Sequence, residues 1–106
     1  MISKLKELLG IKPAPNYKKL LQEGGIIVDV RSKAEFSGGH IKGSKNIPLQ
    51  TLSANIEKLK DKNKPIITCC ASGMRSASAK SVLKSNGFSN VHNGGSWAAL
   101  NGKISS

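Results

Sequence analysis

The sequence has few aromatic residues, few cysteines and few acidic residues, and each shortage argues against a class of protein. One Trp, one Tyr and two Phe cannot form the rows of stacked side chains that bind single-stranded nucleic acids, so nucleic-acid binding is disfavoured. The two cysteines, Cys69 and Cys70, are adjacent, which argues against a disulfide framework and favours a reducing compartment, the cytoplasm. No apolar run approaches the roughly 20 residues of a transmembrane segment. Charges at Lys4, Lys6 and Glu7 argue against a secretory signal.

Positive charge is what the sequence has in excess. Seventeen Lys and Arg residues outnumber six Asp and Glu residues, which gives a net charge of +11. Such a surface attracts anions, including small anionic substrates. The 106 residues, 38% of them apolar, suffice for one hydrophobic core but not for two. We therefore expect a monomer with an N-terminal helix and linker over residues 1–15 and one domain over residues 16–106.

Strands and helices are predicted to alternate along the domain. The predicted strands are residues 26–30, 46–48, 65–69 and 90–92, and the predicted helices lie after Asn16, after Ser32, around Leu52, Ile56 and Leu59, over residues 76–86 and after Gly95. Asn16 is a predicted N-cap, and Ser32 with Glu35 has the spacing of a capping box. This alternation predicts an α/β fold, a small parallel sheet of about five strands with helices on both faces.

A six-residue loop, Cys70-Ala71-Ser72-Gly73-Met74-Arg75, joins the predicted strand 65–69 to the next helix. In parallel sheets, ligands bind at the carboxyl ends of the strands, next to helix N-termini that favour anions. Small residues let such a loop turn its backbone N–H groups inward, and these dipoles lower the pKa of a thiol. Cys70 is therefore the predicted nucleophile.

Each residue of this loop has a predicted role toward an anionic ligand. Cys70 is the catalytic residue, and Arg75 binds an oxyanion such as a thiosulfonate through its planar guanidinium. The predicted substrate-binding residues are Ala71, Ser72, Gly73, Met74, Arg75 and Ser76. No metal or organic cofactor is expected, because His40 and His92 lie far in sequence from the adjacent thiols.

At these residues the sequence resembles the rhodanese-like domains, whose active loop reads Cys-x-x-Gly-x-Arg-Ser, here Cys70 to Ser76. Further matching pieces, in family order, are Val28-Asp29-Val30-Arg31, Glu35-Phe36, Gly39 to Pro48, Gly87-Phe88, Val91, Gly94-Gly95 and Trp97. The resemblance implies a sulfurtransferase that moves sulfane sulfur from thiosulfate or a related small anionic donor, through a persulfide on Cys70, to a thiophilic acceptor. That acceptor is cyanide in vitro, and a thiol or protein acceptor is the expected partner. The resemblance also implies that Asp29 and His40 are mainly framework.

Two alternatives stay open at this point. Counting from Cys69 gives Cys-(five residues)-Arg-Ser, the spacing of cysteine-dependent phosphatases and arsenate reductases. Gly73 lies three residues after Cys70, and Thr68 stands where those phosphatases have His, so Cys70 is favoured and Cys69 is expected to fill the strand end as a small apolar side chain. The second alternative is a non-enzymatic sulfur-carrier or interaction module, against which the intact Cys70 loop argues.

Overall fold

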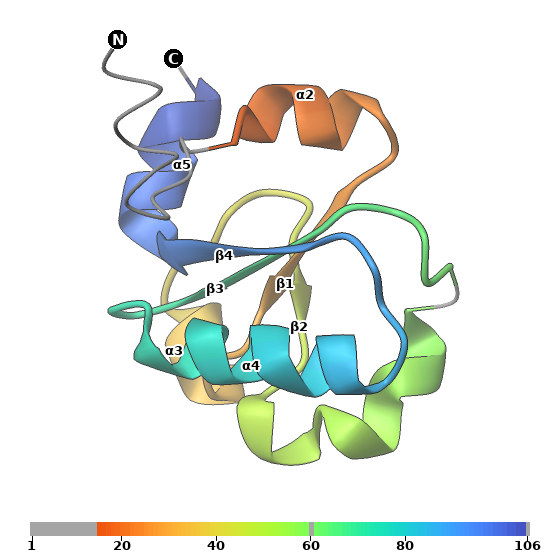
Figure 1. Ribbon diagram of the computed structural model, residues 1–106. Helices are drawn as coiled ribbons and strands as arrows, with labels where there is room; N and C mark the ends of the chain where they lie inside the picture. The colour runs from red at the N-terminus through yellow and green to blue at the C-terminus, as the bar shows by residue number, and fades with distance from the viewer. Residues whose placement is uncertain (1–14, 60, 106) are drawn as a thin grey trace, which may run out of the picture.

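A sheet of four parallel strands, in the order β2-β1-β3-β4, lies at the centre of the part of the chain that the structure describes (Figure 1). This computed structural model describes residues 15–59 and 61–105. The strands are β1 (Ile26–Asp29), β2 (Lys45–Asn46), β3 (Ile66–Cys70) and β4 (Val91–Ser96). The predicted α/β fold with a small parallel sheet is confirmed, with four strands in place of about five. The helix predicted within residues 1–15 lies outside the described residues, Pro15 excepted.

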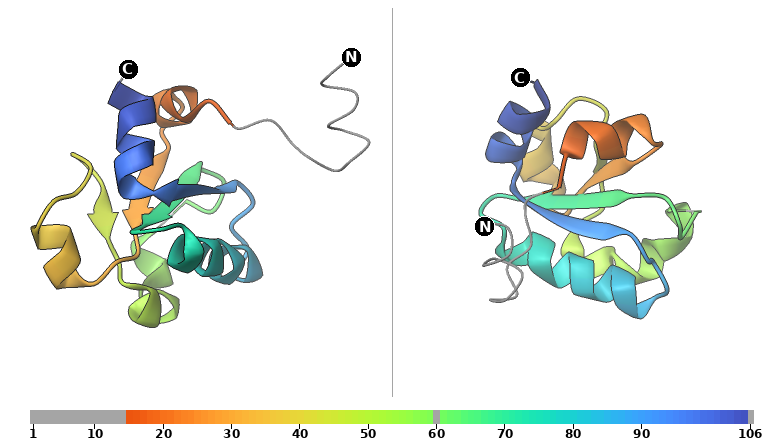
Figure 2. Two further views of the ribbon diagram at one scale, coloured as in Figure 1. Left: turned by 90° about the vertical axis from the view of Figure 1, so that its left-hand side faces the viewer. Right: turned by 45° about the horizontal axis from the view of Figure 1, so that its top comes forward.

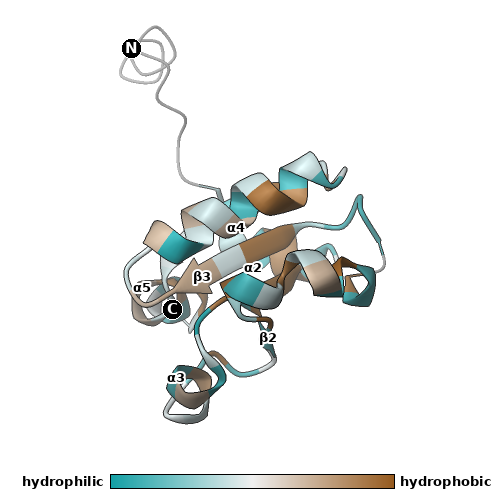
Figure 3. Cartoon of the chain, turned by 90° about the horizontal axis from the view of Figure 1, so that it is seen from below, coloured by the Kyte–Doolittle hydropathy of each residue, from teal (hydrophilic) through white to brown (hydrophobic). Residues whose placement is uncertain are grey.

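Helices cover both faces of the sheet, as predicted (Figures 1 and 2). Helices α2 (Tyr17–Gln22) and α5 (Trp97–Ser105) cover one face, and α4 (Met74–Ser85) covers the other. Side chains alternate along a strand, so β3 contributes Ile67 and Cys69 to the core under α2 and α5, and Ile66 and Cys70 to the core under α4. Figure 3 shows β3, coloured mainly toward the hydrophobic end, between α4 and α2. No helix in the described ranges is long and apolar enough to cross a membrane.

Two helix starts follow the capping rules that the sequence indicated. The Asn16 side chain accepts a hydrogen bond from the Lys19 backbone N–H at 3.2 Å and begins α2. Helix α3 (Lys33–Ser37) begins with the predicted capping box: Glu35 N–H donates to Ser32 Oγ at 3.2 Å, and Ser32 N–H donates to Glu35 Oε1 at 3.1 Å. These bonds satisfy backbone donors that a helix start leaves free. They also fix the position of the Glu35 side chain.

The prediction of a regular helix around Leu52, Ile56 and Leu59 is wrong. The segment forms two 3₁₀ pieces, η1 (Leu49–Thr51) and η2 (Ser53–Lys58), with a kink at Asn55, whose φ is −118°. The Asn55 side chain donates to the Thr51 carbonyl at 2.8 Å, and such local bonds compete with regular helix geometry. Leu52 and Leu59 are nevertheless buried. The apolar spacing therefore identified the inward residues correctly but not the helix type.

Asp29 and Arg31 form a buried ion pair at the end of β1, which confirms the framework role expected for Asp29. Arg31 Nη2 lies 2.8 Å from Asp29 Oδ2, and the two side chains are 5% and 0% exposed. The same guanidinium donates from Nη2 to the Gly39 carbonyl at 2.7 Å and lies 4.8 Å from the centre of the Trp97 ring. Arg31 thereby ties β1 to the 38–44 connection and to the start of α5.

The close packing of β4 against β3 and α5 requires glycine at position 94. A Cβ on Gly94 would lie 2.8 Å from Ile67 Cγ2 and 2.9 Å from the Thr68 carbonyl oxygen. We expect Gly94→Ala to lower the free energy of unfolding by about 1–3 kcal/mol, because the core must shift to admit one methyl group. Gly102→Ala is the matched control: its Cβ meets nothing within 4 Å on α5, and helix propensity should raise stability by up to about 1 kcal/mol. Urea unfolding of both variants measures the difference, and equal effects would contradict the packing argument.

Candidate active site

Cys70 ends β3, and its sulfur lies beneath the exposed residues of the loop that follows. Cys70 itself is fully buried, whereas Ala71 and Ser72 are exposed. Gly73 is the N-cap of α4 and has a φ of 101°, a conformation that side-chain-bearing residues rarely adopt. This turn folds the loop back over Cys70, so that the backbone of the loop encloses the sulfur atom.

Backbone N–H groups converge on the Cys70 sulfur, as the loop was predicted to provide. Gly73 N–H donates to Cys70 Sγ at 2.9 Å, and Ser76 N–H donates at 3.4 Å. The Ser76 hydroxyl oxygen lies 3.6 Å from the sulfur. Such an arrangement suits a negatively charged sulfur atom, because several donors share one acceptor.

The electrostatics distinguish the two cysteines. Burial alone raises the pKa of Cys70, but hydrogen bonds from Ser76, Gly73 and Ser72 outweigh burial and bring this pKa below its ordinary value. At Cys69, burial and the nearby Asp29 carboxylate raise the pKa to about 12. Since the thiolate is the reactive form of a cysteine, the lower pKa of Cys70 makes it the better suited of the two to act as a nucleophile.

The position of Cys69 argues against the phosphatase register. Cys69 lies on the opposite face of β3, packed in the core with Ile67 and Leu100, and contributes no sulfur to the loop. It fills the strand end as a small apolar side chain, as the sequence indicated. A loop built around Cys69, which a phosphatase or arsenate reductase of this kind needs, is therefore absent from the described residues.

Of the other predicted substrate-binding residues, Met74 is exposed and Ser76 is buried. Met74 is 79% exposed and stands at the outer rim beside Gly73, so its apolar side chain is available to an incoming molecule. Ser76 is buried, and its hydroxyl contacts the Gly73 carbonyl at 3.0 Å and Asn93 Oδ1 at 2.6 Å. Ser76 therefore acts on the Cys70 sulfur from below the loop.

Arg75 was expected to bind an oxyanion, but in the structure its guanidinium pairs with the Glu35 carboxylate. Its Nη1 and Nη2 donate to the two carboxylate oxygens of Glu35 at 2.8 and 2.9 Å, and both side chains are a little over one third exposed. The hydrogen bonds from Arg75 are the main cause that lowers the pKa of Glu35 to about 2, and the hydrogen bond from the Ser32 backbone N–H is the second. The guanidinium thus faces a carboxylate on α3 in this structure. Glu35 neutralises the cation that was expected to bind the oxyanion.

Asn93 on β4 belongs to the site, although the sequence pattern did not single it out. Its carboxamide oxygen accepts from the Ser76 hydroxyl and from Gly95 N–H, the latter at 2.9 Å. Its Nδ2 lies 3.4 Å from the Gly73 carbonyl oxygen. One sequence feature could have identified Asn93 as a site residue: it is a polar residue directly before Gly94-Gly95, after a predicted strand. That strand lies next to the strand that ends at Cys70.

His40 and Trp97 serve the framework rather than the sulfur. His40 Nδ1 lies 2.8 Å from the Phe36 carbonyl oxygen, and the two rings stack with centroids 3.7 Å apart. Trp97 packs on the core beneath α5 and under the Arg31 guanidinium. Within residues 15–59 and 61–105, no group of three or more His, Cys, Asp or Glu side chains is placed to hold a metal ion.

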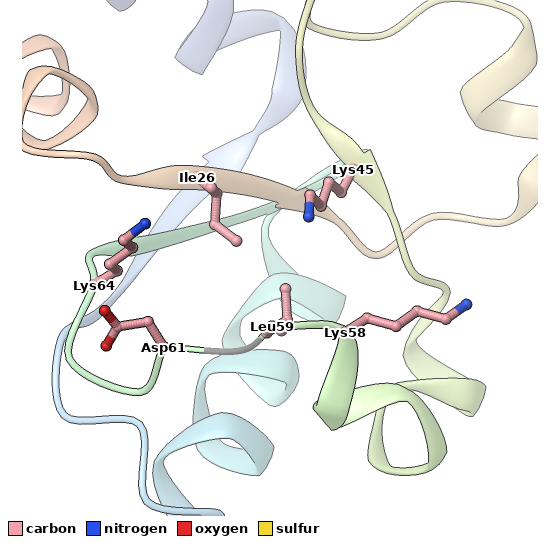
Figure 4. A pocket seen from close by; sticks show the side chains of 6 residues that line it. All are labelled: Ile26, Lys45, Lys58, Leu59, Asp61 and Lys64. Atoms are coloured by element: carbon pink, nitrogen blue, oxygen red, sulfur yellow. The ribbon is translucent and has the colours of Figure 1, made fainter.

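A pocket of about 250 Å³ lies at the end of the sheet where β1 and β3 begin, whereas Cys70 is the last residue of β3. It opens beside Ile26, the first residue of β1, and Lys64, which precedes β3. Figure 4 shows Ile26 and Leu59 facing one another across it, with lysines and Asp61 around its edge. None of the residues that line this pocket belongs to the Cys70 loop.

Comparison with known proteins places this loop in a family. Residues 14–101 match the family model of the Rhodanese-like domain. The chain belongs to the rhodanese-like family. The thiosulfate sulfurtransferase GlpE of Pseudomonas fluorescens (strain Pf0-1) is 36% identical over 80 residues, which cover 76% of this chain and 72% of that protein.

Two further comparisons show how far the likeness extends. The uncharacterized protein YqhL of Bacillus subtilis is 37% identical over 79 residues; these cover 74% of this chain but 62% of YqhL, less than two thirds of its length. A solved rhodanese-like domain protein from Staphylococcus aureus is 34% identical and has a TM-score of 0.64, covering 92% of this chain and 82% of that one. The rhodanese-like fold expected from the sequence is confirmed.

Proposed function

We propose that this rhodanese-like domain is a sulfurtransferase that carries sulfane sulfur as a persulfide on Cys70, with thiosulfate or a related small anion as donor. The observation that supports this most strongly is the Cys70 sulfur enclosed by the N–H groups of Gly73 and Ser76, while Cys69 faces the opposite core. An adjacent general base is unnecessary, because the loop itself favours the thiolate. The protein acts in the cytoplasm, where free thiols stay reduced.

The first half-reaction loads the cysteine. The Cys70 thiolate attacks the outer sulfur of thiosulfate and forms a new S–S bond. The bond between the outer sulfur and the sulfonate sulfur breaks, and sulfite leaves with its electron pair. The positive potential of the loop amides then stabilises the anionic persulfide, as it stabilised the thiolate.

The second half-reaction delivers the sulfur. An acceptor nucleophile attacks the terminal sulfur of the persulfide, the persulfide S–S bond breaks, and the Cys70 thiolate is regenerated. With cyanide the new bond is C–S and the product is thiocyanate. With a thiol or protein acceptor the product is a persulfide on that acceptor.

Mass spectrometry and a thiocyanate assay test this proposal on the intact protein. Thiosulfate should add the mass of one sulfur atom to the protein, and cyanide should remove it with release of thiocyanate. Loading without catalytic turnover would identify a sulfur carrier instead of an enzyme. Hydrolysis of an aryl phosphate without any sulfur loading would identify a phosphatase and reject the proposal.

The Arg75–Glu35 ion pair should govern the affinity for the anionic donor. We expect Arg75→Ala to raise the KM for thiosulfate roughly tenfold with little change in kcat, because it leaves the Glu35 carboxylate unpaired beside the loop, where it repels the donor. The double variant Glu35→Gln with Arg75→Ala should recover part of this loss, since no net charge remains. Steady-state kinetics at low and high salt provide the measurement. An unchanged KM in Arg75→Ala would show that neither charge acts on the donor.

A further inference from the structure

A chain of hydrogen bonds connects Asn93 to the reactive sulfur through Ser76. Asn93 Oδ1 accepts from Gly95 N–H at 2.9 Å, which fixes the orientation of the amide, because the Nδ2 group could not accept this bond. The same oxygen lies 2.6 Å from Ser76 Oγ, and Ser76 Oγ lies 3.6 Å from Cys70 Sγ. The Thr68 hydroxyl donates to the Ser76 carbonyl at 2.9 Å and holds the serine backbone in place.

The Ser76 hydroxyl has one proton and several neighbours that can accept it. Asn93 Oδ1 at 2.6 Å is the closest, the Gly73 carbonyl oxygen lies at 3.0 Å, and the Cys70 sulfur lies at 3.6 Å. An amide oxygen at this short distance accepts the proton, so the lone pairs of Ser76 Oγ face the sulfur. This arrangement suits a neutral thiol, which donates its own S–H to Ser76. A thiolate has no proton to donate and requires one from Ser76 instead.

We propose that Asn93 is a positioning residue that acts through Ser76: its amide oxygen holds the serine proton while Cys70 is a thiol and releases that proton to the sulfur on ionisation. Asn93 therefore competes with the thiolate for one hydrogen bond. It limits how far the loop lowers the pKa of Cys70. The inference deepens the proposed sulfur transfer, because the thiolate is the form that attacks the donor.

The charged and titratable groups around Cys70 are held by other partners or stay neutral. The hydrogen bond of the Ser76 hydroxyl is therefore the contribution to the pKa of Cys70 that Asn93 can change. Cys69, its neighbour on β3, stays protonated because its pKa is about 12. Arg75 on α4 is held by Glu35 of α3, and the Asp29 carboxylate on β1 is paired with Arg31. None of these groups contacts the Ser76 hydroxyl through a hydrogen bond in the described ranges.

Titration of the Cys70 thiolate by its ultraviolet absorbance tests the proposal without any sulfur donor. Cys69, with a pKa of about 12, and Tyr17, whose pKa burial raises above its ordinary value, both ionise far above neutrality, so the thiolate signal around neutral pH reports Cys70. We expect Asn93→Ala to lower the pKa of Cys70 by about half to one unit, which raises the thiolate fraction on the acid side roughly three- to tenfold. Asn93→Asp should raise this pKa, because a carboxylate holds the serine proton more strongly and adds a negative charge.

The Ser76→Ala background decides whether Asn93 acts through the serine hydroxyl. In that background Asn93→Ala should leave the pKa of Cys70 unchanged, and Asn93→Asp should keep the smaller rise that its charge alone causes. Shifts of equal size with and without the hydroxyl, or shifts of the same sign in the Ala and Asp variants, would mean that Asn93 merely fastens the loop and would overturn the inference. If Asn93→Ala does not fold, the Asp variant in the two backgrounds decides alone. Failure of sulfur transfer would leave this titration intact, so the two proposals fail separately.

Discussion

We expect Cys70→Ser to lower thiocyanate formation by about 1,000-fold or more, and Cys69→Ser to retain most of the activity. The reason is the alternation of side chains along β3, which places one sulfur inside the loop and the other in the core beneath α2 and α5. Serine at position 70 keeps the shape of the loop but cannot form a persulfide. Steady-state thiocyanate production by the two variants and the wild type measures the contrast.

The pH profile provides an independent control on this assignment. Donor consumption should rise as Cys70 ionises, with a midpoint below the ordinary pKa of a thiol, because Ser76 and Gly73 donate to its sulfur and outweigh the effect of burial. Cys69, with a pKa of about 12, should add no second rise near neutrality. Equal losses in the two cysteine variants would show that both sulfurs take part. Phosphate release that depends on Cys69 would show that the longer loop register is the active one.

Arg31→Met is expected to lower the free energy of unfolding by about 3–5 kcal/mol, the largest stability effect predicted for this domain. The substitution leaves the Asp29 carboxylate, 0% exposed, without its guanidinium partner in the core. It also removes the hydrogen bond to the Gly39 carbonyl and the contact with the Trp97 ring. Urea unfolding followed by circular dichroism measures the loss.

Two variants show whether the unpaired buried charge causes this loss. Adding Asp29→Asn to Arg31→Met should recover a large part of the stability, because no charge then remains in the core. Arg75→Ala breaks the half-exposed pair with Glu35 and should cost no more than about 1 kcal/mol, since solvent screens exposed pairs. A loss of similar size in Arg75→Ala and Arg31→Met would contradict the role of burial.

Local patterns in the sequence were sufficient to predict much of the fold and which of the two cysteines the loop encloses. The capping box joins Ser32 and Glu35, only three positions apart, and needs no tertiary contact, so it could be predicted from spacing. Continuous apolar runs preceded by glycine or proline likewise indicated the buried strands β1 and β3. The loop that begins at Cys70 follows a strand and precedes a helix, and this local order is what directs its N–H groups at the sulfur.

The type of helix and the partners of side chains could not be predicted from the sequence, because they depend on competition between groups that the fold brings together. Leu52 and Leu59 are buried as their spacing indicated, yet the Asn55 side chain bonds to the backbone and the segment folds as 3₁₀ pieces. Arg75 was expected to face the loop anion, but Glu35 lies 40 positions earlier in the chain and is brought beside it by α3. A cation pairs with the carboxylate that the fold places nearest to it, and the separation of two residues in the sequence does not predict which carboxylate this is.

The sequence by itself determined that a cysteine stands at the end of a buried strand and just before a helix, since strand, loop and helix follow one another within a short stretch of chain. The tertiary structure alone decided what surrounds that cysteine. Asn93 reaches Ser76 because β4 pairs in parallel with β3, and Glu35 reaches Arg75 because the tertiary fold brings α3 beside the start of α4. The physical reason is that these contacts depend on strand order and packing, which bring together residues that no local pattern connects.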